Sequence, residues 1–281
     1  MANQKIYTLV VPRFEDIFHS YFAQEIIKGT SSAASRLKVD LLIHITERGQ
    51  HDDWFTSRAL KSKFCDGILF ADIDKDRVGL DKIISKNIPY LVLNNYFQEP
   101  INCIAIDNYK ATLQIIDYLV ELGHKRIATI CGDLHTEAGL ERLRGYKDGL
   151  RNHNLPINEQ YIKNGEFLRT PAHNAAGEIL SQPELPTAIF AASDVMALEV
   201  MDVAKTKNIR IPQDLSVVGF DDNPLNVYSL VALTTVSQPI SEMARIGLET
   251  LHRIAEGKEN LPAKKKLAAK LIKRSSCTNH Y

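Results

Sequence analysis

Short apolar runs alternate with helix-periodic stretches along almost the whole 281-residue chain, and this alternation limits the possible folds more than any other feature. Residues 6–11 (IYTLVV) and 126–131 (RIATIC) have the composition of buried strands. Residues 109–122 and 240–256 instead repeat apolar positions at the helical period, and Gly123 follows the first of them where a helix-terminating glycine is common. Strands that alternate with helices predict an α/β fold, with parallel sheets flanked by helices.

The pattern of strands and helices restarts at residue 126, which predicts two Rossmann-like lobes. No low-complexity tract or obvious linker separates them, so we expect the lobes to touch and the chain to cross between them more than once. Open α/β sheets bind ligands beyond the carboxyl ends of their strands. Two such sheets that face each other favour a ligand site in the cleft at their interface.

Charge and cysteine usage argue against several classes of protein. Lys+Arg and Asp+Glu both total 34, so the chain lacks the basic excess of a DNA-binding domain. We interpret the basic run at residues 264–266 as a solvated loop before a closing strand at 266–272. The four cysteines have no metal-like spacing with histidine, and most lie in apolar runs, which favours buried free thiols. No apolar run reaches the roughly 18 residues of a membrane span.

Motifs that carry nucleotide or hydrolytic chemistry are missing from the sequence. It contains no G-x-G-x-x-G after a strand, no Walker A, no H-E-x-x-H and no G-x-S-x-G. Its nine histidines are scattered, without pairs at helical metal-ligand spacing. We therefore predict that the protein is not an enzyme, and we expect no catalytic residues, no metal site and no cofactor.

Polar residues directly after predicted strands are the first candidates for ligand binding, because a parallel sheet presents groups to a ligand there. They are Asp107, Ser193, Asp194, Asp221 and Asp222. The competing interpretation is a helix cap or a turn residue. We favour that interpretation for Asp194, as the N-cap of the following helix, and for Asp222, which precedes Asn-Pro. For Asp107 and Asp221 the pattern leaves both interpretations open.

One arginine and several aromatic residues complete the candidate site. Arg142 lies in a helix-like stretch, where it points either inward or to solvent. A guanidinium offers paired planar donors and a carboxylate offers paired acceptors, so an inward Arg142 facing aspartates suits a polyhydroxylated ligand. Phe167, Tyr21 and Phe22 are candidates for stacking on an apolar ring face, although core packing is the favoured interpretation of lone aromatic residues.

Six segments, in order, resemble motifs of the LacI/GalR family of bacterial transcription regulators. They are YLVELGHKRIATICG at residues 118–132, ERLRGYKDGL at 141–150, PTAIFAASDVM at 186–196, LSVVGFDDN at 215–223, LTTVSQP at 233–239 and LIKRS at 271–275. Each motif alone has moderate specificity, but six in the same order make the resemblance highly specific, and it extends over nearly the whole chain.

The resemblance implies a periplasmic-binding-protein-like core of two lobes joined by three crossovers. The expected N-terminal lobe is 1–121 plus 239–263, and the C-terminal lobe is 122–238 plus 264–281. The family implies a cytoplasmic homodimer that binds a small effector in the interlobe cleft, most often a sugar or sugar derivative and sometimes a purine or nucleoside. A helix-turn-helix head should precede the first strand and is absent here, so operator DNA would be bound only through that head.

Five predicted ligand contacts follow from position in the family motifs. Arg142 matches the ligand-clamping arginine, and Asp221 matches the aspartate of the G-[FY]-D turn. Asp107 matches the aspartate after the fifth strand, and Phe167 matches the aromatic that stacks on the ligand. Ser193 takes a position where many members have asparagine, which implies a different pattern of ligand hydroxyls.

The sequence departs from the family pattern around the first helix. Residues 12–22 (PRFEDIFHSYF) are longer than the family segment and lack its Asn-Pro, so Phe18, Tyr21 and Phe22 are candidates for an unusual wall of the site. Two other functions compete with the regulator. A solute-binding protein of a sugar importer would share the fold but be exported and monomeric, and an α/β enzyme would need the motifs that are missing. The GHKR and LTTVSQP motifs favour the regulator.

Overall fold

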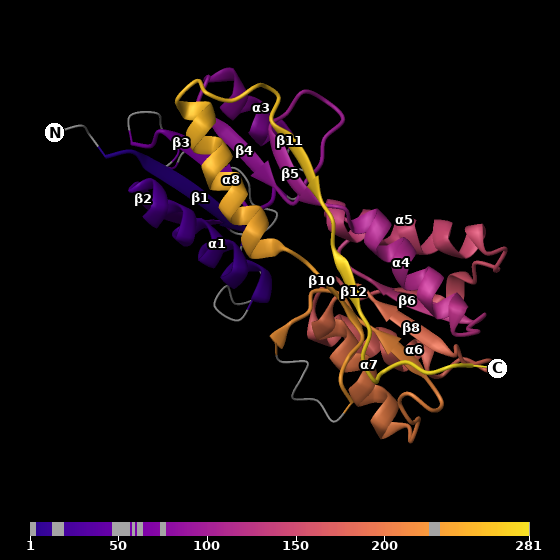
Figure 1. Ribbon diagram of the computed structural model, residues 1–281. Coiled ribbons are helices and arrows are strands. Elements are labelled where there is room, and N and C mark those ends of the chain that lie inside the picture. The colour runs from indigo at the N-terminus through magenta and orange to yellow at the C-terminus, as the bar shows by residue number, and fades with distance from the viewer. Residues whose placement is uncertain are drawn as a thin grey trace. The chain divides into compact units, whose positions relative to one another are not determined.

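The computed structural model describes residues 4–12, 20–46, 57, 60, 64–73, 77–224 and 231–280. By its internal contacts the chain forms two compact units, each built from two stretches of sequence (Figure 1). Unit 1 comprises Met1–Ile106 and Pro239–Leu267, and unit 2 comprises Asp107–Gln238 and Ala268–Tyr281. Each unit has a parallel sheet with helices packed on it, which confirms the predicted α/β class.

Unit 1 is organised around a six-stranded sheet in the order β11-β5-β4-β3-β1-β2, in which every neighbouring pair is parallel. The strands are β1 (Ile6–Pro12), β2 (Asp40–Thr46), β3 (Gly67–Phe70), β4 (Tyr90–Leu93), β5 (Cys103–Ile106) and β11 (Lys264–Leu267). The inner strands are apolar and almost wholly buried, as parallel strands under helices must be. At one edge, β2 exposes Leu42, Ile43 and Ile45.

The helices described in unit 1 are α1 (Tyr21–Leu37), α3 (Arg77–Ser85) and α8 (Ile240–Ala255). The N-cap of α1 is Ser20, whose hydroxyl oxygen accepts a hydrogen bond from the Ala23 amide. Helices α1 and α8 pack closely at Gly29, where a β carbon would collide with the carbonyl oxygen of Ser241. A glycine is therefore required at the crossing of these two helices.

Unit 2 contains a four-stranded parallel sheet in the order β7-β6-β8-β9 and a small antiparallel pair, β10 with β12. The strands are β6 (Ile127–Cys131), β7 (Ile162–Asn164), β8 (Ala188–Ala191), β9 (Ser216–Val218), β10 (Thr235–Ser237) and β12 (Lys270–Ile272). The helices are α4 (Asn108–Glu121), α5 (Glu137–Asn152), α6 (Arg169–Ile179) and α7 (Asp194–Thr206), with a 3-10 turn at Glu159–Tyr161.

The chain passes between the units at three places, two of which differ from expectation. The first follows Ile106 instead of residue 121, because α4 packs on α5 inside unit 2, where a β carbon on Gly149 would lie 2.8 Å from Ile116. The second lies between Gln238 and Pro239. The third lies after residue 267 instead of 263, because β11 pairs with β5 in unit 1.

Two predictions for the C-terminal region are wrong. The basic run is not a loop but part of β11, where the amines of Lys264 and Lys266 lie 4.9 and 4.5 Å from the ring centre of Tyr96. The single closing strand at 266–272 is divided into β11 and β12, because the chain changes unit after Leu267. Lysine on an edge strand hinders pairing with another chain, which gives this run a structural role.

The cysteines behave as the sequence predicts. All four are free, and Cys65, Cys103 and Cys131 are buried. Burial raises the pKa of the Cys131 thiol to about 12, so this thiol stays protonated and unreactive at neutral pH. Within the described ranges, no helix combines the length and the hydropathy that crossing a membrane requires.

Candidate functional site

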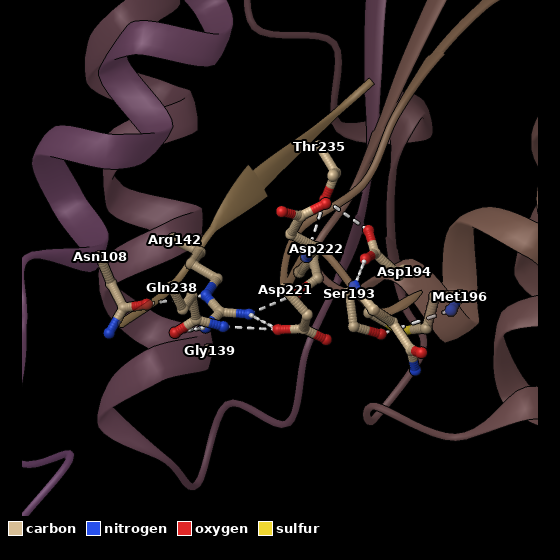
Figure 2. A network of polar contacts seen from close by, with 12 residues as sticks. Asn108, Gly139, Arg142, Ser193, Asp194, Met196, Asp221, Asp222, Thr235 and Gln238 are labelled. Carbon is tan, nitrogen blue, oxygen red and sulfur yellow. Dashed lines mark hydrogen bonds and ion pairs between the residues drawn. The ribbon is translucent and has the colours of Figure 1, made fainter. Parts of the chain in front are cut away.

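Several of the predicted site residues gather in unit 2 beyond the carboxyl ends of its parallel strands. Strand β8 ends at Ala191 and β9 ends at Val218, and the loops that follow bring Asp194 and Asp221 into one polar network (Figure 2). Arg142 reaches the same network from α5, the helix after β6. Parallel strands place all their carboxyl ends at one edge of the sheet, which explains why residues so distant in sequence meet there.

Arg142 is the most constrained side chain of the network. The residue is only 4% exposed. Its Nε donates to Asn108 Oδ1 at 2.9 Å and its Nη1 donates to the carbonyl oxygen of Ala192 at 2.5 Å. Its Nη2 donates to Gln238 Oε1 at 3.3 Å. These bonds fix the guanidinium in one orientation and use one hydrogen on each of its three nitrogens, so a hydrogen on each Nη is left for a further acceptor.

Two aromatic rings flank the Arg142 guanidinium. Its central carbon lies 3.7 Å from the centre of the buried Phe220 ring and 5.6 Å from the centre of the Phe167 ring. Burial lowers the pKa of Arg142 to about 10, against the opposing effect of the charges on Asp221 and Asp194. The guanidinium therefore keeps its positive charge at neutral pH although it is taken out of water.

Asp221 faces Arg142 from the turn after β9. One carboxylate oxygen lies 3.9 Å from Arg142 Nη1 and accepts a 2.5 Å hydrogen bond from Gln238 Nε2. Its side chain remains 21% exposed, against 5% for Arg142, so the carboxylate is the accessible half of the pair. Burial raises the pKa of Asp221 to about 7, the Arg142 charge opposes this rise, and the Asp194 charge adds to it.

The turn that carries Asp221 has an unusual backbone. Asp221 has φ +131° and Asp222 has φ +60°, both in the region that favours glycine. Such a turn persists only when its surroundings hold it. The Asp221 amide donates to the carbonyl oxygen of Val236 at 2.9 Å, and the Asp222 carboxylate accepts a 2.6 Å hydrogen bond from Arg274. The prediction of Asp222 as a turn residue agrees with this arrangement.

Asp194 holds the same turn from the other side. Its carboxylate accepts hydrogen bonds from the Thr235 hydroxyl at 2.5 Å and from the Asn223 amide at 2.7 Å. Gly219 is required next to it, because a β carbon there would collide with the Asp194 carboxylate. The sequence interpretation of Asp194 as the N-cap of α7 is wrong by one residue, since the N-cap is Ser193, whose hydroxyl accepts from the Met196 amide at 3.3 Å.

Asp107 and Ser193 are both helix caps. Asp107 is the N-cap of α4, where its carboxylate accepts from the Lys110 amide at 3.2 Å and lies 3.6 Å from the Lys110 amine. Its neighbour Asn108 is the residue that bonds Arg142. Ser193 is 5% exposed, and its hydroxyl is engaged at the start of α7. A contact of either residue with a ligand therefore stays a prediction.

The aromatic candidates lie in two places. Phe167 follows β7 with φ +61°, and its ring covers Gly132 so closely that a β carbon at that glycine would collide with it. This placement puts the Phe167 ring beside Arg142, and its role in stacking on a ligand stays a prediction. Tyr21 and Phe22 begin α1 in unit 1, where both are half-buried. Their role as ligand contacts stays a prediction, and Phe18 lies outside the described residues.

Three residues of the network escaped the sequence predictions. Asn108 and Gln238 bond Arg142, and Phe220 lies under its guanidinium. Each had a signal in the sequence: Asn108 directly follows Asp107, Phe220 precedes Asp221, and Gln238 lies between a strand-like run and a helix-starting proline. Within the part of the chain that the structure describes, no group of three or more His, Cys, Asp or Glu side chains is placed to hold a metal ion.

The network as a whole can bind an uncharged ligand with adjacent hydrogen-bond donors and acceptors. One guanidinium faces the carboxylates of Asp221 and Asp194, so the site has no surplus positive charge for an anion. Arg142 supplies donors, the exposed part of Asp221 supplies acceptors, and Phe167 supplies an apolar face. The chemistry of these groups is recognition by hydrogen bonding and stacking.

Comparison with known proteins gives one matching family over most of unit 2. A family described as periplasmic binding protein-like domain matches residues 116–277. The chain is 31% identical over 272 residues to the HTH-type transcriptional regulator DegA of Bacillus subtilis strain 168. This alignment covers 95% of this chain and 79% of DegA. It is 32% identical over 273 residues to the HTH-type transcriptional repressor CytR of Escherichia coli strain K12, covering 95% and 78% respectively.

Solved structures of similar fold cover the chain almost completely. The transcriptional regulator CelR, in complex with cellobiose, has a TM-score of 0.89 and 28% identity, covering 98% of this chain and 86% of CelR. A regulatory protein of the LacI family from Chloroflexus aggregans has a TM-score of 0.89 and 25% identity, covering 98% and 99% respectively. The relatives found by sequence and the structures found by fold are therefore all regulatory proteins.

Proposed function

This chain belongs to the LacI family of transcription regulators, and from that premise we propose that it is the effector-sensing and dimerisation core of such a regulator. The proposed effector is a neutral, polyhydroxylated small molecule, with a sugar or sugar derivative first and a nucleoside second. Unit 2 supplies Arg142 and Asp221 as its principal contacts. In our proposal, operator DNA is bound through a helix-turn-helix segment, because the similar proteins DegA and CytR are both named as HTH-type regulators.

The observation that carries this proposal is the buried guanidinium of Arg142 beside the partly exposed carboxylate of Asp221. Adjacent ligand hydroxyls can accept from the guanidinium and donate to the carboxylate at the same time. Because Asn108, Gln238 and Phe220 already fix the guanidinium, binding would cost little further ordering of this side chain. The cellobiose complex of the similar regulator CelR supports a sugar as the first class to test.

Regulation in this proposal follows from a difference in effector affinity between two arrangements of the protein. An effector can shift an equilibrium only by as much as its affinity differs between the two states. By linkage, an effector that lowers affinity for DNA is itself bound less tightly when DNA is bound. A DNA-bound regulator acts in the compartment that holds the chromosome, so we place it in the cytoplasm.

Dimerisation is the second part of the proposal, and unit 1 supplies its support. Edge strand β2 exposes Leu42 (39%), Ile43 (41%) and Ile45 (38%), three large apolar side chains on one short strand. An exposed apolar edge of this kind is the usual mark of an interaction site. We propose that a second copy of the chain covers it.

The experiment that tests effector binding is a thermal-shift screen followed by titration calorimetry. A ligand that binds the native state raises the melting temperature by mass action. The probes are cellobiose, D-ribose, adenosine and cytidine, each with its phosphorylated counterpart as control. We expect a shift with at least one neutral probe, loss of its binding heat in Arg142→Ala, and retention in Arg144→Ala, whose side chain lies on the exposed face of the same helix. Equal affinity of Arg142→Ala and the wild type would overturn the proposal.

The importer alternative is not favoured, because the similar proteins named above are transcription regulators. The proposal also makes the protein a binder and not an enzyme. A probe that raises the melting temperature but is recovered chemically changed after incubation would contradict this part.

A further inference from the structure

Gln238 bridges both charged groups of the site with one carboxamide. Its Oε1 accepts from Arg142 Nη2 at 3.3 Å, and its Nε2 donates to Asp221 Oδ1 at 2.5 Å (Figure 2). The reverse orientation would set amide hydrogens against guanidinium hydrogens and oxygen against carboxylate oxygen, so chemistry determines the orientation. Gln238 is thus the one described side chain that hydrogen-bonds both members of the pair.

The backbone just before Gln238 is fixed by contacts with strand β12 and with the turn that carries Asp221. Ser237 ends β10, and it pairs with Lys270 of β12 and forms a bridge with Asp221. The carbonyl oxygen of Val236 accepts from the Asp221 amide at 2.9 Å. These contacts fix the backbone position from which the Gln238 side chain extends. Its length therefore determines which atoms it reaches, and a shorter amide could not reach both partners.

Gln238 also has a special place in the chain, because it is the last residue of the first stretch of unit 2, and unit 1 resumes at Pro239. Pro239 is the N-cap residue of α8, and its carbonyl oxygen accepts from the Met243 amide at 2.8 Å in the first turn. One peptide bond therefore links the residue that bonds Arg142 and Asp221 to the residue that begins α8.

The charges that face Asp221 come from two helices and its own turn. Arg142 on α5 stabilises its anionic form, and Asp194 on α7 destabilises it. The neighbouring Asp222 is paired with Arg274. Against these charged groups Gln238 is a neutral donor, and its hydrogen bond lowers the pKa of Asp221. Loss of this donor should favour the protonated carboxyl group without changing the number of charges.

We propose that Gln238 is a positioning residue, which holds Arg142 and Asp221 in the geometry that receives the effector and passes changes at this pair to the first turn of α8. This inference rests on the proposed function, because it assigns a role within the same site. It predicts effects that can be measured with no effector added, so its test is independent of whether the effector class is correct.

The first experiment is a pH titration of the Asp221 carboxyl carbon by NMR, in chain labelled with ¹³C-aspartate and with the signal assigned through Asp221→Asn. We expect the titration midpoint to move upward in Gln238→Ala, because the carboxylate loses a donor. The control is Gln182→Ala, which removes an amide that donates to Glu178 far along the chain from the site. Gln238→Asn should also move the midpoint upward, and it serves if the alanine variant does not fold. An unchanged midpoint in a folded Gln238 variant would overturn the positioning role.

The second experiment measures hydrogen exchange of the Met243 amide in the full chain. If the bridge anchors the start of α8, both Gln238→Ala and Asp221→Ala should speed this exchange several-fold, because each removes one end of the Gln238–Asp221 hydrogen bond. Gln182→Ala should leave the rate as in the wild type. Equal Met243 exchange rates in all four proteins would refute the transmission to α8. The NMR titration would decide the positioning role separately.

Discussion

The two units use the same architecture but arrange polar groups differently where their strands end. In unit 1, Asn94 Nδ2 donates to Asp72 Oδ2 at 2.8 Å, and Asn95 Oδ1 accepts from the Ile73 amide at 3.2 Å. In unit 2, a guanidinium meets two carboxylates, and one of these, on Asp221, stays 21% exposed. Asp72, Asn94 and Asn95 are all buried to 8% exposure or less.

This difference shows that the sheet determines where polar residues cluster. The residue types then determine whether the cluster only stabilises the loops or also leaves charged groups accessible to a ligand. In unit 1 the amides that follow β4 bond a carboxylate and a backbone amide in the neighbouring loop after β3, and no cation takes part in these two bonds. In unit 2 a buried cation is held by neutral groups from three segments, and its carboxylate partner remains reachable. Burying charged groups costs desolvation free energy, and natural proteins accept such costs mainly at functional sites.

The largest expected effect comes from breaking the unit 2 network. Arg142→Ala leaves the Asp221 and Asp194 carboxylates without their cation, so we expect the free energy of unfolding to fall by about 3 kcal/mol and effector binding to be lost. The dimer should remain folded. Urea unfolding at pH 7 measures the loss. The matched change in unit 1 is Asp72→Asn, which keeps an acceptor for Asn94 and should cost less than about 1 kcal/mol. Equal losses would remove the distinction between the two networks.

The next effect is the pH dependence of stability that Asp221 should give to unit 2. Burial raises the pKa of Asp221 to about 7, so the folded chain binds this proton more tightly than the unfolded chain does. The resulting stabilisation is complete below the ordinary aspartate value near 4 and is lost as the pH rises through about 7, by at most about 1.4 kcal/mol per pH unit.

The comparison that checks this effect is wild type against Asp221→Asn, by urea unfolding from pH 4 to 8. The wild type should lose stability relative to the variant across that range. Effector affinity should move the opposite way and rise with pH, because a ligand hydroxyl donates to the ionised carboxylate. If the stabilities of the two proteins changed in parallel with pH, the pKa of Asp221 would not be raised in the folded chain, and the prediction would be wrong.

A third test concerns the surface that distinguishes unit 1. Ile43→Lys places a charge on the exposed edge strand β2, and we expect the dimer to dissociate at least tenfold more readily, a change of about 1.4 kcal/mol. Sedimentation equilibrium measures the dissociation constant. The control is Val78→Lys, which changes an apolar side chain that is 67% exposed on α3 of the same unit. Dissociation constants that agree among the three proteins would rule out β2 as the interface.

The smallest effect separates a helix cap from a ligand contact in unit 2. Ser193→Ala removes the hydroxyl that accepts from the Met196 amide, and we expect a loss of about 1 kcal/mol in unfolding free energy. Thr136→Ala, at the N-cap of α5, is the matched control for loss of a cap. If Ser193 also contacts the effector, calorimetry will show weaker binding for Ser193→Ala than for Thr136→Ala.

Local patterns predicted the fold and the two central residues of the site. Alternating strands and helices are a property of neighbouring residues, so the α/β class follows directly from them. Arg142 and Asp221 could be selected because each lies in a motif that resembles the family. The sequence could not decide whether Ser193 or Asp194 is the N-cap of α7. Both residue types form N-caps, and the choice depends on which of the two has the extended backbone angles of a cap.

Other features depend on contacts between distant segments. Gln238 reaches Arg142 only because β10 pairs with β12, more than thirty residues later in the chain. The division of residues 264–272 into β11 and β12 depends on the pairing of β11 with β5. The placement of α4 in unit 2 depends on its packing against α5. No local pattern of residues encodes these pairings.

The most direct test of the central claim is a crystal structure of the chain with the probe that gives the greatest thermal shift. The account predicts two adjacent hydroxyl groups of that probe within hydrogen-bond distance of the Arg142 guanidinium and the Asp221 carboxylate, with the Phe167 ring against its apolar face. A bound probe that touches neither Arg142 nor Asp221 would contradict the account.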